Sequence, residues 1–226
     1  MPAKIDKLIR SSRKTVAILV HPDGQVTVRA PKQVPLAQIQ AFVDSKAEWI
    51  EKKQEIARLK RQSKPGPRRF VEGETFLYLG KEYPLAVCEE PGKPLTLEGD
   101  RFVLRPSSRS APRETFYLWY ERQAHTVIKQ RVEALAKKFN LHYTKIRITS
   151  ARTRWGSCSS TGTLSFSWRL IMAPLEVIDY VVIHELAHTV EPNHSKRFWD
   201  RVAAMDPNYA KYVKWLKENG HRLVLE

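Results

Sequence analysis

The stretch that decides the fold is residues 175–188, LEVIDYVVIHELAH, which ends in the pentapeptide HELAH at 184–188. Apolar side chains occupy nearly every side of this segment, which is the composition of a helix buried in a core. Pro174 precedes it and suits the first position of such a helix. The sequence therefore predicts a buried helix that carries two histidines near its end.

Those two histidines are spaced for a shared metal ion. His184 and His188 are four residues apart, so both imidazoles project from one face of the helix. His194 follows six residues later, after Pro192-Asn193, which we expect to stop the helix and to turn the chain back towards the ion. The predicted metal ligands are therefore His184, His188 and His194.

Three neutral imidazoles with a fourth position left open are typical of a catalytic zinc site, because structural zinc sites close all four positions, often with cysteine. Zinc lowers the pKa of a bound water to about 7, and a neighbouring carboxylate can take the proton as the water attacks a carbonyl. Glu185 is the candidate for that base. Zinc is the favoured ion, although nickel, cobalt or manganese could occupy the same ligands in vitro. The alternative is that His184 and His188 are core histidines satisfied by hydrogen bonds.

Length and composition indicate a globular protein. The chain has 226 residues, of which 42% are apolar, enough for one large or two small domains. No secretory signal is evident, and no segment approaches the ~20 apolar residues of a membrane span, so we expect neither export nor membrane insertion. Cys88 and Cys158 are the only cysteines, which fits a reducing cytoplasm. The sequence leaves the oligomeric state open.

The net charge of +15 favours an acidic partner such as nucleic acid or nucleotide. This charge is divided evenly, since residues 1–110 carry +8 and residues 111–226 carry +7. A dedicated nucleic-acid tail would concentrate it. The densest basic cluster lies at residues 60–69, around Pro65-Gly66-Pro67, and is interpreted as a solvated linker.

The sequence of residues 1–110 predicts a β-rich region with one long helix. Residues 16–20 and 26–30 flank Pro22-Asp23-Gly24 and read as a hairpin. Apolar residues at helical spacing predict an amphipathic helix over residues 36–58. Three short strands are then expected between Gly- and Pro-containing turns, at residues 76–79, 83–87 and 102–104.

The sequence of residues 111–226 predicts a second region, which contains the helix with His184 and His188. A long helix is expected over residues 111–139, then a strand at 146–148 and a turn at 155–158. Residues 163–168 alternate apolar and polar side chains, as in a strand with one buried face. If the edge of that strand is free, an extended peptide could pair with it. Ser195 is a plausible N-cap of a last amphipathic helix.

Four segments together resemble a known family. They are RTRWGSC (152–158), TLSFSWRLIMAP (163–174), YVVIHELAH (180–188) and PNHSKRFW (192–199). This pattern is similar to the YgjP-like metallopeptidases, bacterial zincins related to the SprT-like proteases. The match is specific from about residue 152 to residue 220 and looser through the front strands.

The resemblance implies an α+β fold with a zincin-like catalytic core, in which long helices pack on a small, mostly antiparallel sheet. This core would occupy residues 111–226, after the β-rich region at 1–110. His184, His188 and His194 match the metal ligands of the family, and Glu185 matches its catalytic glutamate. The resemblance does not identify a natural substrate.

Further polar residues have less certain roles. Arg152 and Arg154 could hold an oxyanion, a carboxylate or a phosphate, or could instead bond to loop carbonyls. Cys158 is interpreted as a small buried residue rather than a ligand. The transition state also needs a hydrogen-bond donor, for which three candidates lie downstream, and the sequence does not choose among them: Tyr209, Tyr212 and His221.

Three functional hypotheses follow from these features. The first is a cytoplasmic zinc metallopeptidase that acts on polypeptides, with Glu185 as the general base. The second places a nucleoside triphosphate pyrophosphatase at the same metal site, because the surplus of basic residues suits nucleotides. The third is a basic protein associated with nucleic acid, whose zinc site organises the fold. The sequence has no recognisable nucleic-acid-binding motif, which favours the enzymes; nucleic-acid association is then an accessory property.

Overall fold

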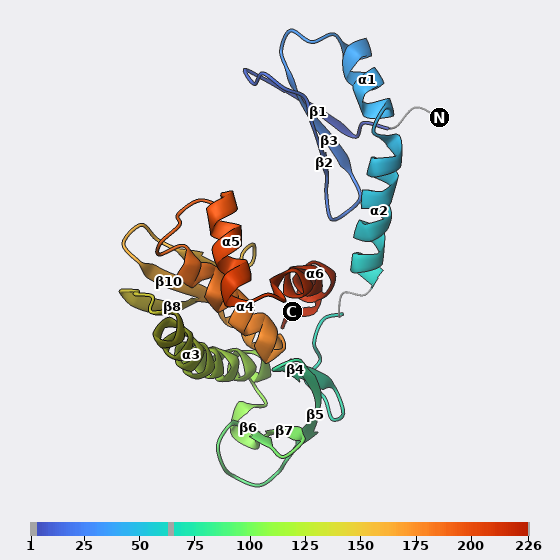
Figure 1. Cartoon of the computed structure of the whole chain (residues 1–226). Helices are drawn as coiled ribbons and strands as arrows, with labels where there is room; N and C mark the ends of the chain where they lie inside the picture. Colours follow the sequence, from blue (N-terminus) through green and yellow to red (C-terminus); the bar gives the residue numbers. More distant parts are fainter. Residues whose placement is uncertain (1–3, 63–65, 226) are drawn as a thin grey trace. The chain divides into compact units, whose positions relative to one another are not determined.

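The structure is a computed structural model that describes residues 4–62 and 66–225 (Figure 1). It confirms the α+β class, since helices and small sheets both occur along the chain. The chain divides into two compact units, Met1–Lys64 and Pro65–Glu226. Part of the basic linker expected at residues 60–69 lies outside the described residues, because 63–65 are not described. Each unit is considered by itself below.

The N-terminal unit is a three-stranded sheet with two helices on one side. Its strands are β1 (Lys7–Ser11), β2 (Ala17–Val20) and β3 (Val26–Pro31), in the order β1-β3-β2. The predicted hairpin is present as the antiparallel pair β2–β3, and β1, which was not expected, pairs with β3 in parallel. Its small core consists of six buried apolar residues: Val26, Val28, Ala30, Ile39, Val43 and Ile50.

The helix expected over residues 36–58 is broken in two. The helices are α1 (Leu36–Asp44) and α2 (Ala47–Gln62). The break falls at Ser45, whose hydroxyl donates a hydrogen bond to the carbonyl of Phe42 at 2.7 Å. A serine that bonds to the backbone in this way competes with the regular helical pattern. The apolar spacing continues across the break, so the sequence did not reveal it.

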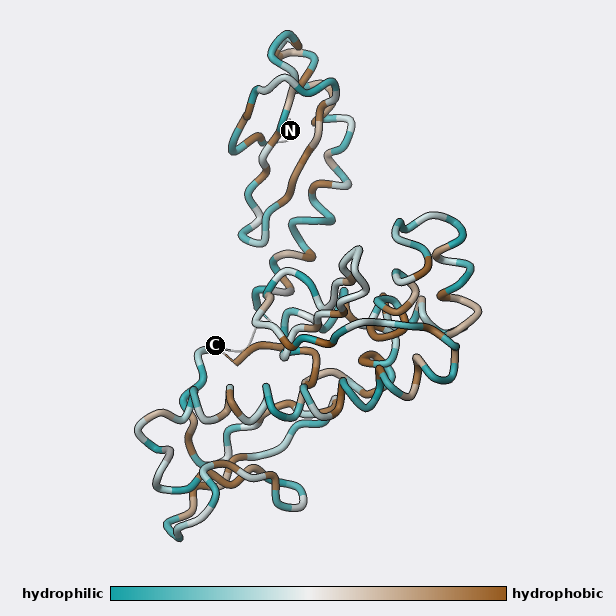
Figure 2. Tube along the Cα trace, turned by 90° about the vertical axis from the view of Figure 1, so that its left-hand side faces the viewer, coloured by the Kyte–Doolittle hydropathy of each residue, from teal (hydrophilic) through white to brown (hydrophobic). Residues whose placement is uncertain are grey.

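The C-terminal unit begins with a four-stranded sheet. Its strands are β4 (Thr75–Tyr78), β5 (Lys81–Val87), β6 (Leu95–Glu98) and β7 (Arg101–Leu104), in the order β4-β5-β7-β6. The sequence analysis anticipated all of these except β6. The sheet is followed by the 3-10 turn η1 (Pro106–Ser108) and by the long helix α3 (Pro112–Phe139). Hydrophobic and hydrophilic colours alternate along this helix in Figure 2, as its amphipathic pattern requires.

The contacts divide the chain at residues 64–65 and not at the expected boundary of residue 110. The reason is aromatic packing between the four-stranded sheet and α3. Phe76 of β4 stacks on Phe116 of α3 with ring centroids 4.2 Å apart, and Phe102 of β7 lies 5.3 Å from the same ring. All three side chains belong to the one large core of this unit. Residues 75–104 therefore share the core of the metal helix.

A second sheet and a buried helix form the rest of that core. The strands are β8 (Lys145–Thr149), β9 (Gly156–Cys158) and β10 (Thr163–Ser167), and the 3-10 segment η2 (Trp168–Met172) leads into α4 (Leu175–Ala187). After α4 come α5 (Lys196–Met205), α6 (Tyr209–Asn219) and η3 (Gly220–Arg222). None of the helices in the described ranges is long and apolar enough to cross a membrane.

Two expectations about the second sheet are wrong. Residues 156–158, expected as a turn, form β9, which pairs antiparallel with β10. β10 also pairs with β8 in parallel, so the sheet is mixed rather than mostly antiparallel and β10 lies at its centre. Because both edges of β10 are occupied, a peptide cannot add to it. A short apolar run does not reveal which strand of a sheet is central.

One ion pair joins the two long helices beneath the site. Arg131 of α3 and Asp179 of α4 form a bidentate pair, with Nε–Oδ1 and one Nη–Oδ2 distances of 2.6 Å. The Asp179 carboxylate raises the pKa of Arg131. Fork-to-fork pairing of this kind is stronger and more specific than a single charged contact. Both side chains are partly shielded, with exposed fractions of 33% and 22%.

We predict that Arg131→Ala lowers the free energy of unfolding by about 1–2 kcal/mol, because it leaves the Asp179 carboxylate half-buried without its partner. Lys129→Ala is the matched control, since Lys129 and Glu133 are exposed and 3.8 Å apart on the same helix. It should cost less than about 0.5 kcal/mol. Urea unfolding followed by circular dichroism measures both. Equal losses in the two variants would contradict a special role for Arg131.

Candidate metal centre

The predicted ligands are brought together by one helix and the turn that follows it. α4 is buried on nearly every side, and it carries His184 in its last turn and His188 at its C-cap. The helix ends one turn before Pro192, where backbone amides of residues 189–191 bond back to the carbonyls of Leu186 and Ala187. The chain then reverses, which brings His194 to the two helical histidines.

The three imidazoles converge on one point. The Nε2 atom of His194 lies 3.0 Å from Nε2 of His184 and 3.1 Å from Nε2 of His188. These residues form a group whose ligand atoms all lie within 4.8 Å of one another. His184 and His188 are half-buried and His194 is exposed, so the cluster opens to solvent on one side.

Aromatic rings of α5 hold the imidazoles in place. Phe198 contacts all three, with ring centroids 4.4–4.9 Å from those of His184, His188 and His194. Trp199 stacks on His194 at 5.8 Å and an interplanar angle of 26°. The predicted N-cap of α5 is present, because the side chain of Ser195 accepts a hydrogen bond from the amide of Phe198.

The protonation pattern of the cluster fits a cation. Nδ1 of His188 is 3.0 Å from the carbonyl oxygen of Glu191, which can only accept, so Nδ1 donates and Nε2 presents its lone pair. A neutral His194 has at most one proton on Nε2, which cannot satisfy contacts to both other rings. A metal ion satisfies all three. Zinc–nitrogen bonds of 2.0–2.1 Å in a tetrahedral site place ligand nitrogens about 3.3 Å apart, close to the separations seen here.

The electrostatics favour the same state. Burial and the neighbouring histidines lower the pKa of His184 to about 4. Burial also lowers the pKa of His188, with the hydrogen bond to Glu191 opposing the shift. Both imidazoles are therefore neutral near pH 7 and can act as ligands.

Glu185 lies beside the cluster in a tight enclosure. Only 5% of the residue is exposed. A Cβ atom built on Gly156 of β9 would lie 2.5 Å from Oε1 of Glu185, so no side chain fits at that position. Burial raises the pKa of Glu185 to about 8, while the positive charge of Arg154 opposes the shift. The carboxyl group is thus held in a low-polarity environment with one cation nearby.

The arginines and the cysteine of the segment 152–158 have distinct positions. Residues two apart on a strand face the same side, so Cys158 shares the side of Gly156 that meets Glu185, whereas Arg154 lies just before β9. Arg154 is exposed, and its charge acts on Glu185. Cys158 is half-buried, and burial followed by the charge of Glu185 raises the pKa of its thiol. Cys158 does not belong to the group of possible metal ligands found among the described residues. Arg152 is exposed.

The three downstream candidates for a hydrogen-bond donor lie in α6 and in the 3-10 turn η3 that follows it. The ring of Tyr209 stacks on Trp199, 5.6 Å away, and Tyr212 lies 6.4 Å from the ring of Tyr180. His221 lies in η3. Tyr180, which the sequence analysis treated only as an apolar residue, lies next to a predicted ligand. Its hydroxyl is 3.5 Å from Nδ1 of His184, and the four-residue spacing on α4 was the available signal.

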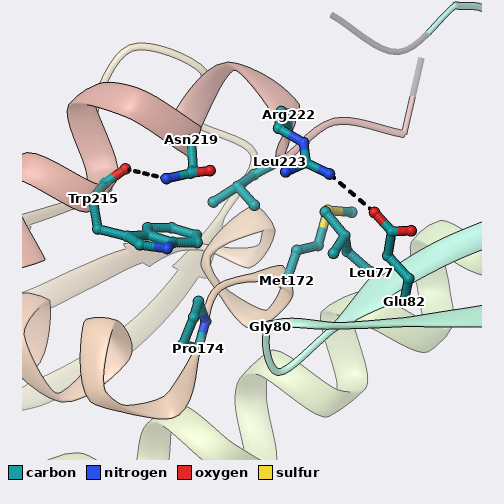
Figure 3. Close-up of a pocket in the computed structure, with 9 residues that line it drawn as sticks. All are labelled: Leu77, Gly80, Glu82, Met172, Pro174, Trp215, Asn219, Arg222 and Leu223. Carbon is teal, nitrogen blue, oxygen red and sulfur yellow. Dashed lines mark hydrogen bonds and ion pairs between the residues drawn. The ribbon is translucent and has the colours of Figure 1, made fainter. Parts of the chain in front are cut away.

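A separate cavity lies at the other end of α4. It has a volume of about 290 Å³, and Pro174, Trp215 and Leu223 are among the residues that line it (Figure 3). Arg222 and Glu82 form an ion pair of 2.9 Å there. Pro174 precedes His184 by ten residues, about 15 Å along a helix. The cavity is therefore not part of the metal centre.

A helix-borne cluster of three imidazoles beside a buried glutamate, on an α+β fold, defines the class of metal-dependent hydrolases. The comparisons with known proteins are more specific. The family model described as YgjP-like, metallopeptidase domain, matches residues 14–219. The chain belongs to this family. It is accordingly a peptidase-type hydrolase, and the family implies a metal ion.

Other comparisons add little. No curated protein matches the chain at a significant level. A solved structure with similarity is the crystal structure of the metallopeptidase zymogen of Pyrococcus abyssi abylysin. It is 22% identical, with a TM-score of 0.38, and the alignment covers 43% of this chain and 99% of that chain. Similarity at this level carries no argument about function or about the arrangement of the core.

We predict that Gly156→Ala destabilises the protein by about 1–3 kcal/mol, because the new methyl group overlaps the carboxyl group of Glu185. The same substitution made in the Glu185→Ala background should cost less, since the overlap is then removed. A double-mutant cycle from thermal or urea unfolding measures the difference. If Gly156→Ala lowers the free energy of unfolding equally in both backgrounds, steric overlap between residue 156 and Glu185 is ruled out as the cause.

The buried glutamate should also give the metal-free protein a distinct pH dependence. The folded-state pKa of about 8 lies above the ordinary glutamate pKa of 4.5, so the folded state holds the proton more tightly. Its contribution to stability is then present below about pH 4.5 and is lost as the pH rises to about 8.

In the presence of a chelator, we therefore expect the stability advantage of Glu185→Gln over the wild type to grow from pH 5 to pH 8, by up to about 3 kcal/mol. Chemical unfolding at each pH measures this advantage. The comparison cancels the titration of the histidines to first order. Stability curves that run parallel for the two proteins would contradict a raised pKa.

Proposed function

We propose that the protein is a cytoplasmic, zinc-dependent metallopeptidase in which His184, His188 and His194 bind the ion and Glu185 is the general base. The observation that carries this proposal is the meeting of three Nε2 atoms at 3.0–3.1 Å beside a glutamate that is 5% exposed. Nitrogen ligands from histidine favour zinc. The proposal also assigns a zincin-like arrangement to residues 111–226. A cytoplasmic location is supported by two free cysteines, Cys88 and Cys158.

Each residue has a definite task in this mechanism. When bound, zinc supplies an acidified water and polarises a substrate carbonyl. The charge of a bound cation would lower the pKa of Glu185 and keep its carboxylate ionised, so that Glu185 would accept the proton from the attacking water and then donate it to the leaving amide nitrogen. Gly156 and the surrounding core exclude bulk water from that carboxylate. Glu191 and Tyr180 orient two of the imidazoles, through contacts of 3.0 Å and 3.5 Å to Nδ1 atoms.

A polypeptide substrate is supported by the free edge of β9. The amide of Ser159 donates a hydrogen bond to the carbonyl of Thr163, and the amide of Ser167 donates to the carbonyl of Trp155. Hydrogen-bonded and non-hydrogen-bonded positions alternate along an antiparallel pair, so the amides of Gly156 and Cys158 point away from β10. Within the described part of the chain no further strand pairs with β9. An extended peptide that paired with this edge would pass directly over Glu185.

The same site could instead hydrolyse nucleoside triphosphates. One observation favours this alternative: Arg154 is exposed, and it is the cation whose charge acts on Glu185. Guanidinium groups bind phosphate oxygens in a bidentate manner. Turnover assays with both substrate classes distinguish the two functions, because loss of Arg154 should impair nucleotide turnover more strongly than peptide turnover.

We predict that Glu185→Gln retains about one zinc per chain, whereas its peptide turnover falls by about 10²–10⁴-fold, since the general base is lost and the ligands remain. Elemental analysis and a panel of unfolded polypeptides and nucleoside triphosphates measure both quantities. Glu176→Gln is the matched control, because Glu176 is exposed in the first turn of the same helix, and it should keep full activity.

His188→Ala should lose both zinc and turnover. Unchanged turnover in Glu185→Gln would overturn the assigned base, and full zinc in His188→Ala would overturn the ligand set. Nucleotide turnover that survives His188→Ala would identify a contaminating enzyme.

A further inference from the structure

The positive charge of the chain is concentrated in the N-terminal unit. Residues 1–64 have 14 basic and 6 acidic side chains, a net charge of +8, and residues 65–226 have 25 and 18, a net charge of +7. Residues 65–110 have seven of each and are neutral. Division at residue 110 gave two halves of similar length and similar net charge. Division at residues 64–65 places a similar net charge on two units of very different length. The first unit has about three times the net positive charge per residue of the second.

Within this unit the excess lies in the sheet layer. Residues 4–34 have seven basic and two acidic side chains, whereas residues 36–62, which include both helices, have six and four. Both carboxylates of the sheet layer are engaged by the backbone. Asp6 accepts from the amide of Val26 at 2.7 Å, and Asp23 accepts from the amide of Gln25 at 2.9 Å.

The sheet has two different faces. Val26, Val28 and Ala30 of β3 point to the helices and are fully buried. The alternate residues Thr27 and Arg29 face the other side, where no helix or strand of this unit covers the sheet in Figure 1. Thr27 is nevertheless buried among neighbouring side chains, with its hydroxyl 2.8 Å from Nε2 of His21, so Arg29 is the exposed residue of β3 on this side. On that face the register places Lys7 opposite Thr27 and Ile9 opposite Arg29, so the two cationic residues lie two positions apart, about 7 Å along the strands. Both Lys7 and Arg29 are exposed.

Among the described residues, this face has no fully exposed large apolar side chain. The exposed large hydrophobic residues of the unit, among those described, all belong to the segment of α1 and α2: Leu36, Phe42, Trp49, Ile56 and Leu59. On the sheet face, Ile9 and Leu19 are half-buried. A membrane or a protein partner would use exposed apolar side chains for most of its binding energy. A partner that binds this face must rely on charge.

We propose that the uncovered face of β1, β2 and β3, with Lys7 and Arg29 at its centre, binds the phosphate backbone of a nucleic acid. Lysine and arginine that neutralise phosphates release condensed counterions, which makes such binding steeply dependent on salt. Contacts to phosphate oxygens carry no sequence information, so the binding is independent of sequence. It brings the catalytic unit to nucleic acid without using the metal centre.

The test uses the full-length protein and measures fluorescence anisotropy with labelled single-stranded and duplex DNA and RNA over a series of salt concentrations. The variant Lys7→Gln/Arg29→Gln should bind about tenfold more weakly, and the slope of log K against log salt on duplex DNA should become shallower by about 1.8. The control Lys46→Gln/Lys52→Gln makes the same change of net charge in the helical layer, at the turn between α1 and α2 and on α2. It should leave both quantities nearly unchanged. Thermal unfolding verifies that both variants fold.

Equal losses in the two variants, or no measurable binding to any nucleic acid, would overturn the proposal. So would stronger binding to phosphatidylserine vesicles or to polyglutamate than to nucleic acid. Binding should be the same for the metal-free protein and for Glu185→Gln. It is thereby tested separately from the proposed peptidase activity, and failure of one leaves the other standing.

Discussion

The structure around the candidate metal centre depends on the burial of α4. Its apolar side chains meet α3, α5, α6 and β9, and this packing leaves the helix no freedom to rotate. The orientation of two imidazoles and of Glu185 is thereby determined by the core. His194 depends on α5 in the same way, through Phe198 and Trp199. Hydrophobic packing, rather than hydrogen bonding, therefore positions most of the site, and side chains held rigidly in this way are what metal binding and catalysis both require.

Glu185 shows how closely packing and chemistry are linked. A charged carboxylate is costly to bury, yet it lies against the backbone of β9 with a single cation in its neighbourhood. Gly156 makes this approach possible because it has no side chain. Within the described residues the same strand also has an unpaired edge, so one short segment encloses the proposed base and is the proposed place of binding for an extended substrate.

The division of the chain changes how its charge is understood. Aromatic contacts between Phe76, Phe102 and Phe116 join the four-stranded sheet to the catalytic unit. The remaining N-terminal unit is small and strongly basic, with one covered and one uncovered sheet face. The two proposals thereby assign different tasks to the two units, with the candidate metal centre in one and the proposed nucleic-acid surface in the other.

The sequence by itself determined the features that depend on local spacing. The helical pattern around HELAH, the histidine at 194, the hairpin at residues 16–30 and the long helix at 112–139 were all predictable, because residues three or four apart, or alternate residues, report directly on a helix or a strand. Only the tertiary structure decided which strand is central in the second sheet, that Gly156 touches Glu185, that Tyr180 approaches His184, and where the two units divide. These features arise from contacts between residues far apart in the chain, and a one-dimensional pattern contains no record of which buried faces meet.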